Sequence, residues 1–418
     1  MLWTAFVIWS IGCAPADTGD VSETVSETDA TVSMDVVPSA NDLQSTDEVV
    51  PIKDPETLRG EAEQSLAAGD HKAASLAARA VFRQQPNDPA NVFLMATVLA
   101  SQHRYQEAVR MLDHLGAQEP AASLPVLGQT AEWLVLQGNW QSAEARFQRV
   151  IDEVPEAAIA HRQLAQLLLR QGRRVEAADS LQQLCRLGDV RESELLTLLT
   201  ISQPLADNAD PETAEAIGVL GEAWSLVSRE QWSDAIERLQ PSAEQSTTHY
   251  GLIGRIHAER ADTKALSDWA LAIVKPDWQG APELQVAIGA DRVAKQQFTE
   301  ALKALYAAIQ YDPSDWRARQ LLADALRDRA DKAAYEKAKT EADTLLRTQE
   351  LAARIIASKQ DKAPLVQDLI AALQPLERPF ESLAWQVLDT IYQSGMTGEA
   401  KQQRINEINA QRLKLLEG

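Results

Sequence analysis

The chain has 418 residues, of which 45% are hydrophobic and 24% are charged. This balance is typical of a folded protein and excludes a wholly disordered chain. Its 61 acidic and 40 basic side chains give a formal net charge of −21, which is the wrong sign for holding a phosphate backbone, so nucleic acid is not expected as a partner. Two cysteines, Cys13 and Cys185, are too few for a disulfide framework or a thiolate zinc site.

The N-terminal residues have the character of an export signal. Residues 2–11 are mostly apolar and too few to span a membrane as a helix. Residues Ile11-Gly12-Cys13 resemble the lipobox of bacterial lipoproteins, although Ser10 and the lack of an early Lys or Arg depart from it, and an ordinary signal peptide is the alternative. Residues 1–13 are therefore predicted to be a signal segment with Cys13 as the lipidation site. The expected location is the bacterial cell envelope, either anchored on the periplasmic side by acyl chains alone or secreted.

An acidic segment follows the candidate lipidation site. Residues 14–56 contain eleven acidic residues, one basic residue, ten Ser or Thr, four prolines and no aromatic residue. Such a composition cannot bury a core, and its like charges repel one another. We therefore predict a disordered spacer between an anchor and a folded body.

Small residues recur at fixed distances through the rest of the chain. An alanine is followed twelve residues later by a proline in the pairs Ala74 and Pro86, Ala108 and Pro120, Ala143 and Pro155, and Ala301 and Pro313. A second small residue comes twelve positions before these alanines, and before Ala177 and Ala235, at Ala62, Ala96, Ala131, Ala165, Ala223 and Gly289. Antiparallel helices approach closely where small side chains face each other, and proline ends a helix. The pattern predicts helical hairpins.

The spacing of these hairpins resembles that of a known family of repeats. Steps of 34, 35 and 34 residues separate Ala74, Ala108, Ala143 and Ala177, and this period resembles that of the tetratricopeptide repeat. Residues 138–155 and 296–313 resemble the second half of such a repeat, including its final proline. The resemblance implies an all-α fold, a right-handed superhelical solenoid of helix-turn-helix hairpins, whose first helices line a concave groove for a protein or peptide partner.

The periodicity also divides the chain. Residues 57–190 are predicted to hold about four repeats. Because 58 residues separate Ala177 from Ala235, residues 191–213 are expected to form an irregular helix and a loop. Residues 214–330 are predicted to hold about three repeats. Residues 331–418 are expected to form a long helix, a divergent final hairpin and a capping helix, which shields the end of the stack.

No motif in the sequence predicts chemistry. There is no HExxH pair, no glycine-rich phosphate loop and no GxSxG serine motif. The sequence therefore predicts a non-catalytic protein without cofactor or metal. Two alternatives stay open. One is a permanent structural subunit of a cell-envelope assembly, and the other is a cryptic enzymatic or ligand-binding activity in residues 319–379, where the periodicity is weakest.

Groove residues follow from the resemblance and not from the periodicity itself. If the register of the family applies, the groove-facing positions are Gln129, Glu132, Arg162, Gln163, Gln166 and Arg170. An equally weighted alternative is that these are solvated surface residues. The Lys and Asn set with which the best-known subgroup of the family clamps chaperone tails is not reproduced, because Arg59, Glu63, Thr97 and Gln129 stand at those positions. The predicted function is an exported interaction scaffold for another class of partner, with an oligomeric state that the sequence leaves open.

Overall fold

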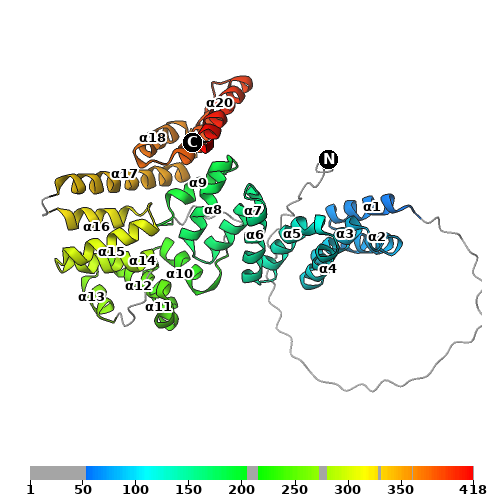
Figure 1. Ribbon diagram of the computed structural model, residues 1–418, viewed down its shortest axis with the longest axis horizontal. Helices are drawn as coiled ribbons and strands as arrows, with labels where there is room; N and C mark the ends of the chain where they lie inside the picture. Colours follow the sequence, from blue (N-terminus) through cyan, green and yellow to red (C-terminus); the bar gives the residue numbers. More distant parts are fainter. Residues whose placement is uncertain (1–52, 205–214, 273–279, 328–330, 360, 418) are drawn as a thin grey trace, which may run out of the picture. The chain divides into compact units, whose positions relative to one another are not determined.

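The computed structural model describes residues 53–204, 215–272, 280–327, 331–359 and 361–417 (Figure 1). These residues form helices and their connections, with no strand among them. The all-helical fold predicted from the sequence is confirmed. Within the same ranges, no helix has both the length and the apolarity needed to cross a bilayer. The predicted signal segment, Cys13 and residues 14–52 of the acidic segment lie outside the described residues.

The first eight helices form four antiparallel pairs, which we call the first array. The helices are α1 (Pro55–Ala67), α2 (His71–Gln84), α3 (Pro89–Ser101), α4 (Tyr105–Gln118), α5 (Ser123–Leu136), α6 (Trp140–Glu153), α7 (Ala158–Arg170) and α8 (Arg174–Leu187). In each pair the two helices pack against each other, and each second helix also packs against the first helix of the next pair. The first array is thus a stack of hairpins.

Local sequence sets where these helices begin and turn. Asp54, Asp70 and Asp88 each precede a helix and accept a hydrogen bond from a backbone N–H in its first turn, which satisfies donors that the helix leaves free. Between the helices of a pair, one residue adopts a left-handed conformation. Gly138 does so with φ 80° between α5 and α6, and His103 takes the same place with φ 60° between α3 and α4.

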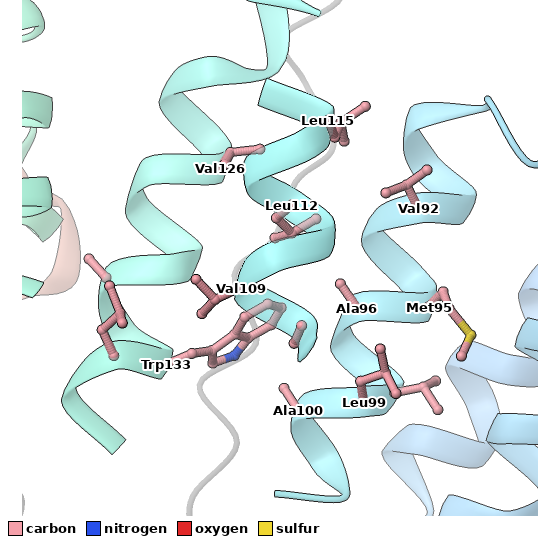
Figure 2. Packing of buried hydrophobic residues seen from close by; sticks show 14 of the residues in the cluster. Val92, Met95, Ala96, Leu99, Ala100, Val109, Leu112, Leu115, Val126 and Trp133 are labelled. Carbon is pink, nitrogen blue, oxygen red and sulfur yellow. The ribbon is translucent and has the colours of Figure 1, made fainter. Parts of the chain in front are cut away.

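Small side chains bring the paired helices together. Ala62, Ala74, Ala96 and Ala108 have no exposed surface, and neither do Ala131 and Ala143. Figure 2 shows the same arrangement around α3, α4 and α5, where apolar side chains such as Leu112 and Trp133 fill the space between the helices. The small residues of each predicted pair are therefore fully buried where the two helices of the pair pack together.

Helix α9 (Glu192–Leu199) is placed like the first helix of a fifth pair. Arg59, the fifth residue of α1, donates from Nη2 to Asn91 Oδ1, in the third residue of α3, at 2.9 Å. Arg162, the fifth residue of α7, donates from Nε to Glu194 Oε1, in the third residue of α9, at 2.6 Å. The same link thus joins α1 to α3 and α7 to α9. Helix α9, however, ends after eight residues.

The start of a second array of helices packs against the turn between α7 and α8. Its helices are α10 (Gly218–Ser228), α11 (Trp232–Leu239), α12 (Thr247–Glu259), α13 (Thr263–Leu271), α14 (Pro282–Ala294), α15 (Phe298–Tyr311) and α16 (Trp316–Leu326). The Ile217 N–H donates to the Arg170 carbonyl at 2.7 Å, and Gly221 lies so close to the same carbonyl that a methyl group there would overlap it. In the pair α14 and α15, Gly289 packs directly against Leu305, four residues beyond Ala301.

The C-terminal helices return to the end of the first array. They are α17 (Lys332–Ala357), α18 (Ala363–Leu373), α19 (Pro379–Tyr392) and α20 (Gly398–Glu417). Helix α17 packs along α16, and both α17 and α19 contact α9 (Figure 1). Cys185, Leu195, Ile355 and Trp385 share one buried core, and the Lys362 ammonium pairs with Glu192 at 2.8 Å. Where a second helix would follow α9, the structure therefore has α17 and α19.

Candidate functional site

Several side chains on one side of the first helices in the first array remain partly or largely exposed. On α5 this side carries Gln129, Glu132 and Leu136, and on α7 it carries Ile159, Gln163 and Gln166. These positions follow i, i+3 and i+4 spacing and lie opposite the fully buried Ala131 and Ala165. With the corresponding residues of α3, which include Thr97, they form what we call the first-helix face.

Four of the six residues predicted for the groove lie half-buried on this face. They are Gln129, Glu132, Gln163 and Gln166. Gln129 Nε2 donates to Glu132 Oε2 at 3.2 Å. Burial raises the pKa of the Glu132 carboxyl, and the bond from Gln129 opposes that shift only in part. The resulting surface is rich in amide groups and poor in charge.

The other two predicted residues, Arg162 and Arg170, form hydrogen bonds where separate segments of the fold meet. Arg162 is 8% exposed and is held by Glu194 and by the carbonyl and carboxylate oxygens of Asp189. The side chain of Arg170 donates from Nε to the Glu215 carbonyl at 2.8 Å, where the second array begins. Both guanidinium groups therefore have partners within the chain.

Apolar side chains flank the amides of the first-helix face. Leu136 is 60% exposed at the end of α5, and Ile159 is 48% exposed at the start of α7. Trp133, in contrast, points into the core between α3, α4 and α5 (Figure 2). The face thus offers hydrogen-bonding groups bordered by apolar contacts, which suits recognition of a polypeptide more than catalysis.

The segment after α9 is buried at the junction of the two arrays. Arg174 of α8 donates from Nε to the Ile201 carbonyl at 2.7 Å, and Trp316 of α16 donates from Nε1 to Gln203 Oε1 at 2.9 Å. The side chain of Gln349 in α17 donates to the Ser202 hydroxyl at 3.4 Å. This segment therefore links α8, α16 and α17. Sequence reasoning expected a helix and loop in this region but did not predict these contacts.

Buried charges also gather at this junction. The Arg255 guanidinium of α12 pairs with Asp315 at the start of α16 and, at 2.6 Å, with Glu259. Burial, aided by the nearby carboxylates of Asp312 and Asp315, raises the pKa of Glu283 to about 7. The charges in otherwise apolar stretches, such as Arg255 between Gly254 and Ile256, were the only sequence signal for this cluster. Among the described residues, no three His, Cys, Asp or Glu side chains are grouped to hold a metal ion.

Comparison with protein families agrees with the geometry of the hairpins. Residues 134–190, from the end of α5 through α8, match the family model described as a tetratricopeptide repeat. Residues 134–190 therefore contain a tetratricopeptide-repeat segment. The matched segment includes Gln163 and Gln166 of the first-helix face, and it contains the last of the three regular steps, from Ala143 to Ala177.

The solved structures that the chain matches include tetratricopeptide-repeat proteins. One from Parabacteroides merdae is 13% identical, with 65% of this chain and 98% of that chain covered and a TM-score of 0.30. The Cut9–Hcn1 hetero-tetramer of the APC/C is 13% identical over 87% of this chain and 85% of that chain, with a TM-score of 0.28. The tetratricopeptide-repeat domain of P58(IPK) is 14% identical over 87% and 99%, with a TM-score of 0.25. No curated protein matches the chain.

Proposed function

We propose that the chain is a non-catalytic scaffold that binds a protein or peptide partner along the first-helix face of α3, α5 and α7. A fold of tetratricopeptide repeats is consistent with a protein-interaction scaffold. The observation that carries the proposal is the row of half-buried, uncharged polar side chains on successive first helices, at Thr97, Gln129, Gln163 and Gln166. Such groups both donate and accept hydrogen bonds, as the backbone of an extended peptide requires.

A matched pair of triple variants tests this proposal. The variant Gln129→Ala, Gln163→Ala and Gln166→Ala removes three amides from the first-helix face. The control, Gln106→Ala, Gln141→Ala and Gln148→Ala, removes three amides from exposed positions on α4 and α6. Both are used as bait in an envelope extract of the source organism, with quantitative mass spectrometry. We expect partners retained by the wild type and the control to be depleted at least tenfold with the first-helix variant. Equal retention by all three would contradict the proposal.

Export and anchoring form the second part of the proposed function. The support is the lipobox-like sequence Ile11-Gly12-Cys13 and the acidic segment that follows it. An acyl group on Cys13 would hold the scaffold at a membrane, with residues 14–52 as the spacer. In detergent phase partitioning, the wild-type chain should enter the detergent phase and Cys13→Ser should remain in the aqueous phase. Identical partitioning of the two would refute lipidation.

A second candidate function is that of a permanent subunit in an envelope assembly. The observation that favours it is the end of α20, where Leu413, Leu415 and Leu416 are each about half exposed, at 56%, 45% and 51%. Exposed apolar side chains of this kind are typical of lasting contacts. Size-exclusion chromatography with light scattering distinguishes the two functions. A transient adaptor purifies at the mass of one chain, whereas a permanent subunit purifies in a complex of fixed composition.

A further inference from the structure

The return of the C-terminal helices to α8 encloses a cavity that lies apart from the first-helix face. Its volume is about 920 Å³, and it is bounded by α8, the turn between α15 and α16, α17, and the turn between α18 and α19. These four segments lie far apart in the sequence and meet only because the chain closes on itself. A cavity of this volume is in the range of sites that enclose a ligand or several side chains.

Apolar side chains form the floor and one wall of the cavity. Cys185, Leu198, Ile201 and Leu345 line it and are each at most 3% exposed. Phe380 lines the wall, and the Arg186 guanidinium lies over its ring at 5.6 Å. The buried Cys185 thiol does not supply a nucleophile, because burial and the carboxylates of Glu381 and Glu194 raise its pKa. The cavity therefore favours an occupant with apolar groups.

The charges around the cavity are unbalanced. The lining has four basic residues and six acidic residues. Arg378 pairs with Glu381, Arg319 pairs with Glu341, and Arg186 lies over the Phe380 ring. Lys337 lies 3.9 Å from the same Glu341 carboxylate. Four further carboxylates line the cavity without an ion pair in the part of the chain that the structure describes, namely Asp179, Asp312, Glu336 and Glu377. The lining therefore carries more negative than positive charge.

Two of these carboxyls have raised pKa values. Burial and the carboxylate of Glu176 raise the pKa of Asp179, and burial and the carboxylate of Asp315 raise the pKa of Asp312. A carboxyl whose ionised form is disfavoured gains from the approach of a cation. A positively charged occupant is thus complementary to the lining, and a negatively charged one is opposed by it.

We propose that this cavity binds a segment of a partner protein that carries an Arg or Lys side chain next to apolar residues. The cation would meet the unpaired carboxylates of Asp179 and Glu377, and its apolar neighbours would contact Phe380 and the floor. A polypeptide fits better than a small polyamine because the lining combines carboxylates with Phe380, Leu376, Pro313 and Pro379, and a polyamine has no apolar side chains to place there.

A bead-displayed peptide library tests the proposal with the full chain. Nonapeptides carry Arg, Lys, Ser or Glu at the central position and randomised residues elsewhere, and binding of fluorescent protein is counted per bead. We expect Arg and Lys beads with apolar residues beside the centre to be enriched at least tenfold over Ser and Glu beads. The enrichment should fall with added salt. The proposal would be overturned if the beads showed no preference for Arg or Lys over Ser. It would also be overturned if spermidine displaced the chain from the beads as readily as a selected peptide does.

Two charge-matched double variants locate the binding. Asp179→Asn with Glu377→Gln removes two exposed carboxylates from the cavity lining, and Asp234→Asn with Glu237→Gln removes two exposed carboxylates from α11. Because all four positions are exposed, both variants should fold, as circular dichroism will verify. We expect selected peptides to bind the cavity variant about tenfold more weakly and the α11 variant normally. Equal affinity for both would overturn the proposal. The variant Gln129→Ala, Gln163→Ala and Gln166→Ala should leave this binding intact, which separates it from the function proposed above.

Discussion

Both arrays bury small residues between their helices, but they differ in the exposure of ion pairs such as Arg59 with Asp88 and Arg255 with Asp315. In the first array, fully buried alanines bring the helices of each pair together, and an ion pair such as Arg59 with Asp88 stays about one-third exposed. At the junction with the second array, Arg255 and Asp315 are 6% and 3% exposed. Regular repeats need only close apolar contact, because each pair presents the same surface to the next. In the second array, a buried ion pair of fixed geometry also links α12 to the start of α16.

The largest expected effect is a difference in stability between variants of Arg162, which links α7 to α9, and of Arg59, which links α1 to α3. Arg162→Met should lower the free energy of unfolding by about 3 kcal/mol, because it leaves Glu194 buried without its cation. Arg59→Met, at the corresponding position of α1, should cost about 1 kcal/mol, since Arg59 and Asp88 remain partly solvated. Urea denaturation followed by circular dichroism measures both.

A double variant provides the control for this comparison. Arg162→Met combined with Glu194→Gln removes both charges, and we expect it to be more stable than Arg162→Met alone. If the two arginine variants cost the same, or if the double variant is the least stable, the buried pair does not have the role assigned to it.

The next effect concerns the contact that starts the second array. Gly221→Val should destabilise the chain by about 2–3 kcal/mol, because the added side chain would overlap the rigid Arg170 carbonyl. Gly60→Ala in α1 is the matched control. No atom lies within 4 Å of the added methyl group, so this variant should gain about 0.5–1 kcal/mol from the better helix propensity of alanine. Hydrogen exchange should show the loss in Gly221→Val concentrated in α10 and α11, and uniform loss along the chain would argue against a local joint.

Much of the first array could be predicted from particular residues. The helices α2, α4, α6 and α15 each end two residues before the prolines that marked the pattern. Ala131 and Ala143 are buried as the spacing required. These features depend on residues within one hairpin, so short-range sequence patterns carry them. The four half-buried residues of the first-helix face were expected from the family resemblance and not from this pattern, and their proposed role in partner binding stays a prediction.

The return of the C-terminal helices could not be predicted in this way. Helix α19 reaches α8 and α9 across nearly 200 residues, and Tyr392 donates a hydrogen bond to Glu192. Nothing in the local periodicity of either segment specifies the other. Helix α18 was not predicted, and the pairing of Arg162 with Glu194 was missed because α9 was interpreted as irregular rather than as a truncated first helix. The cavity depends wholly on these distant contacts.

A smaller effect should depend on pH. Glu283 has a pKa of about 7 in the fold, against 4.5 for an ordinary glutamate, so the folded chain holds more protons than the unfolded chain between these values. Its contribution to the free energy of unfolding therefore falls as pH rises from about 4.5 to 7. Glu283→Gln should be more stable than the wild type by roughly 1–2 kcal/mol at pH 8 and nearly equal to it at pH 4.5. Thermal or urea unfolding across this range measures the difference, and parallel profiles for the two chains would contradict it.

The smallest effect compares the turns of the two arrays. Gln296, between α14 and α15, has φ 57°, and Gly138 has φ 80° at the equivalent position between α5 and α6. The left-handed conformation costs an L-residue roughly 1–2 kcal/mol. Replacing that residue with glycine removes this cost, but the larger entropy of glycine in the unfolded chain offsets part of the gain. Gln296→Gly should therefore stabilise the chain by up to about 1 kcal/mol, and Gly138→Ala should destabilise it by a similar amount. If the two substitutions changed stability in the same direction, backbone strain would not be the factor that distinguishes these two turns. Side-chain contacts, such as the hydrogen bond from Arg292 to Gln297 at 2.7 Å, would then have to set the geometry of the turn between α14 and α15.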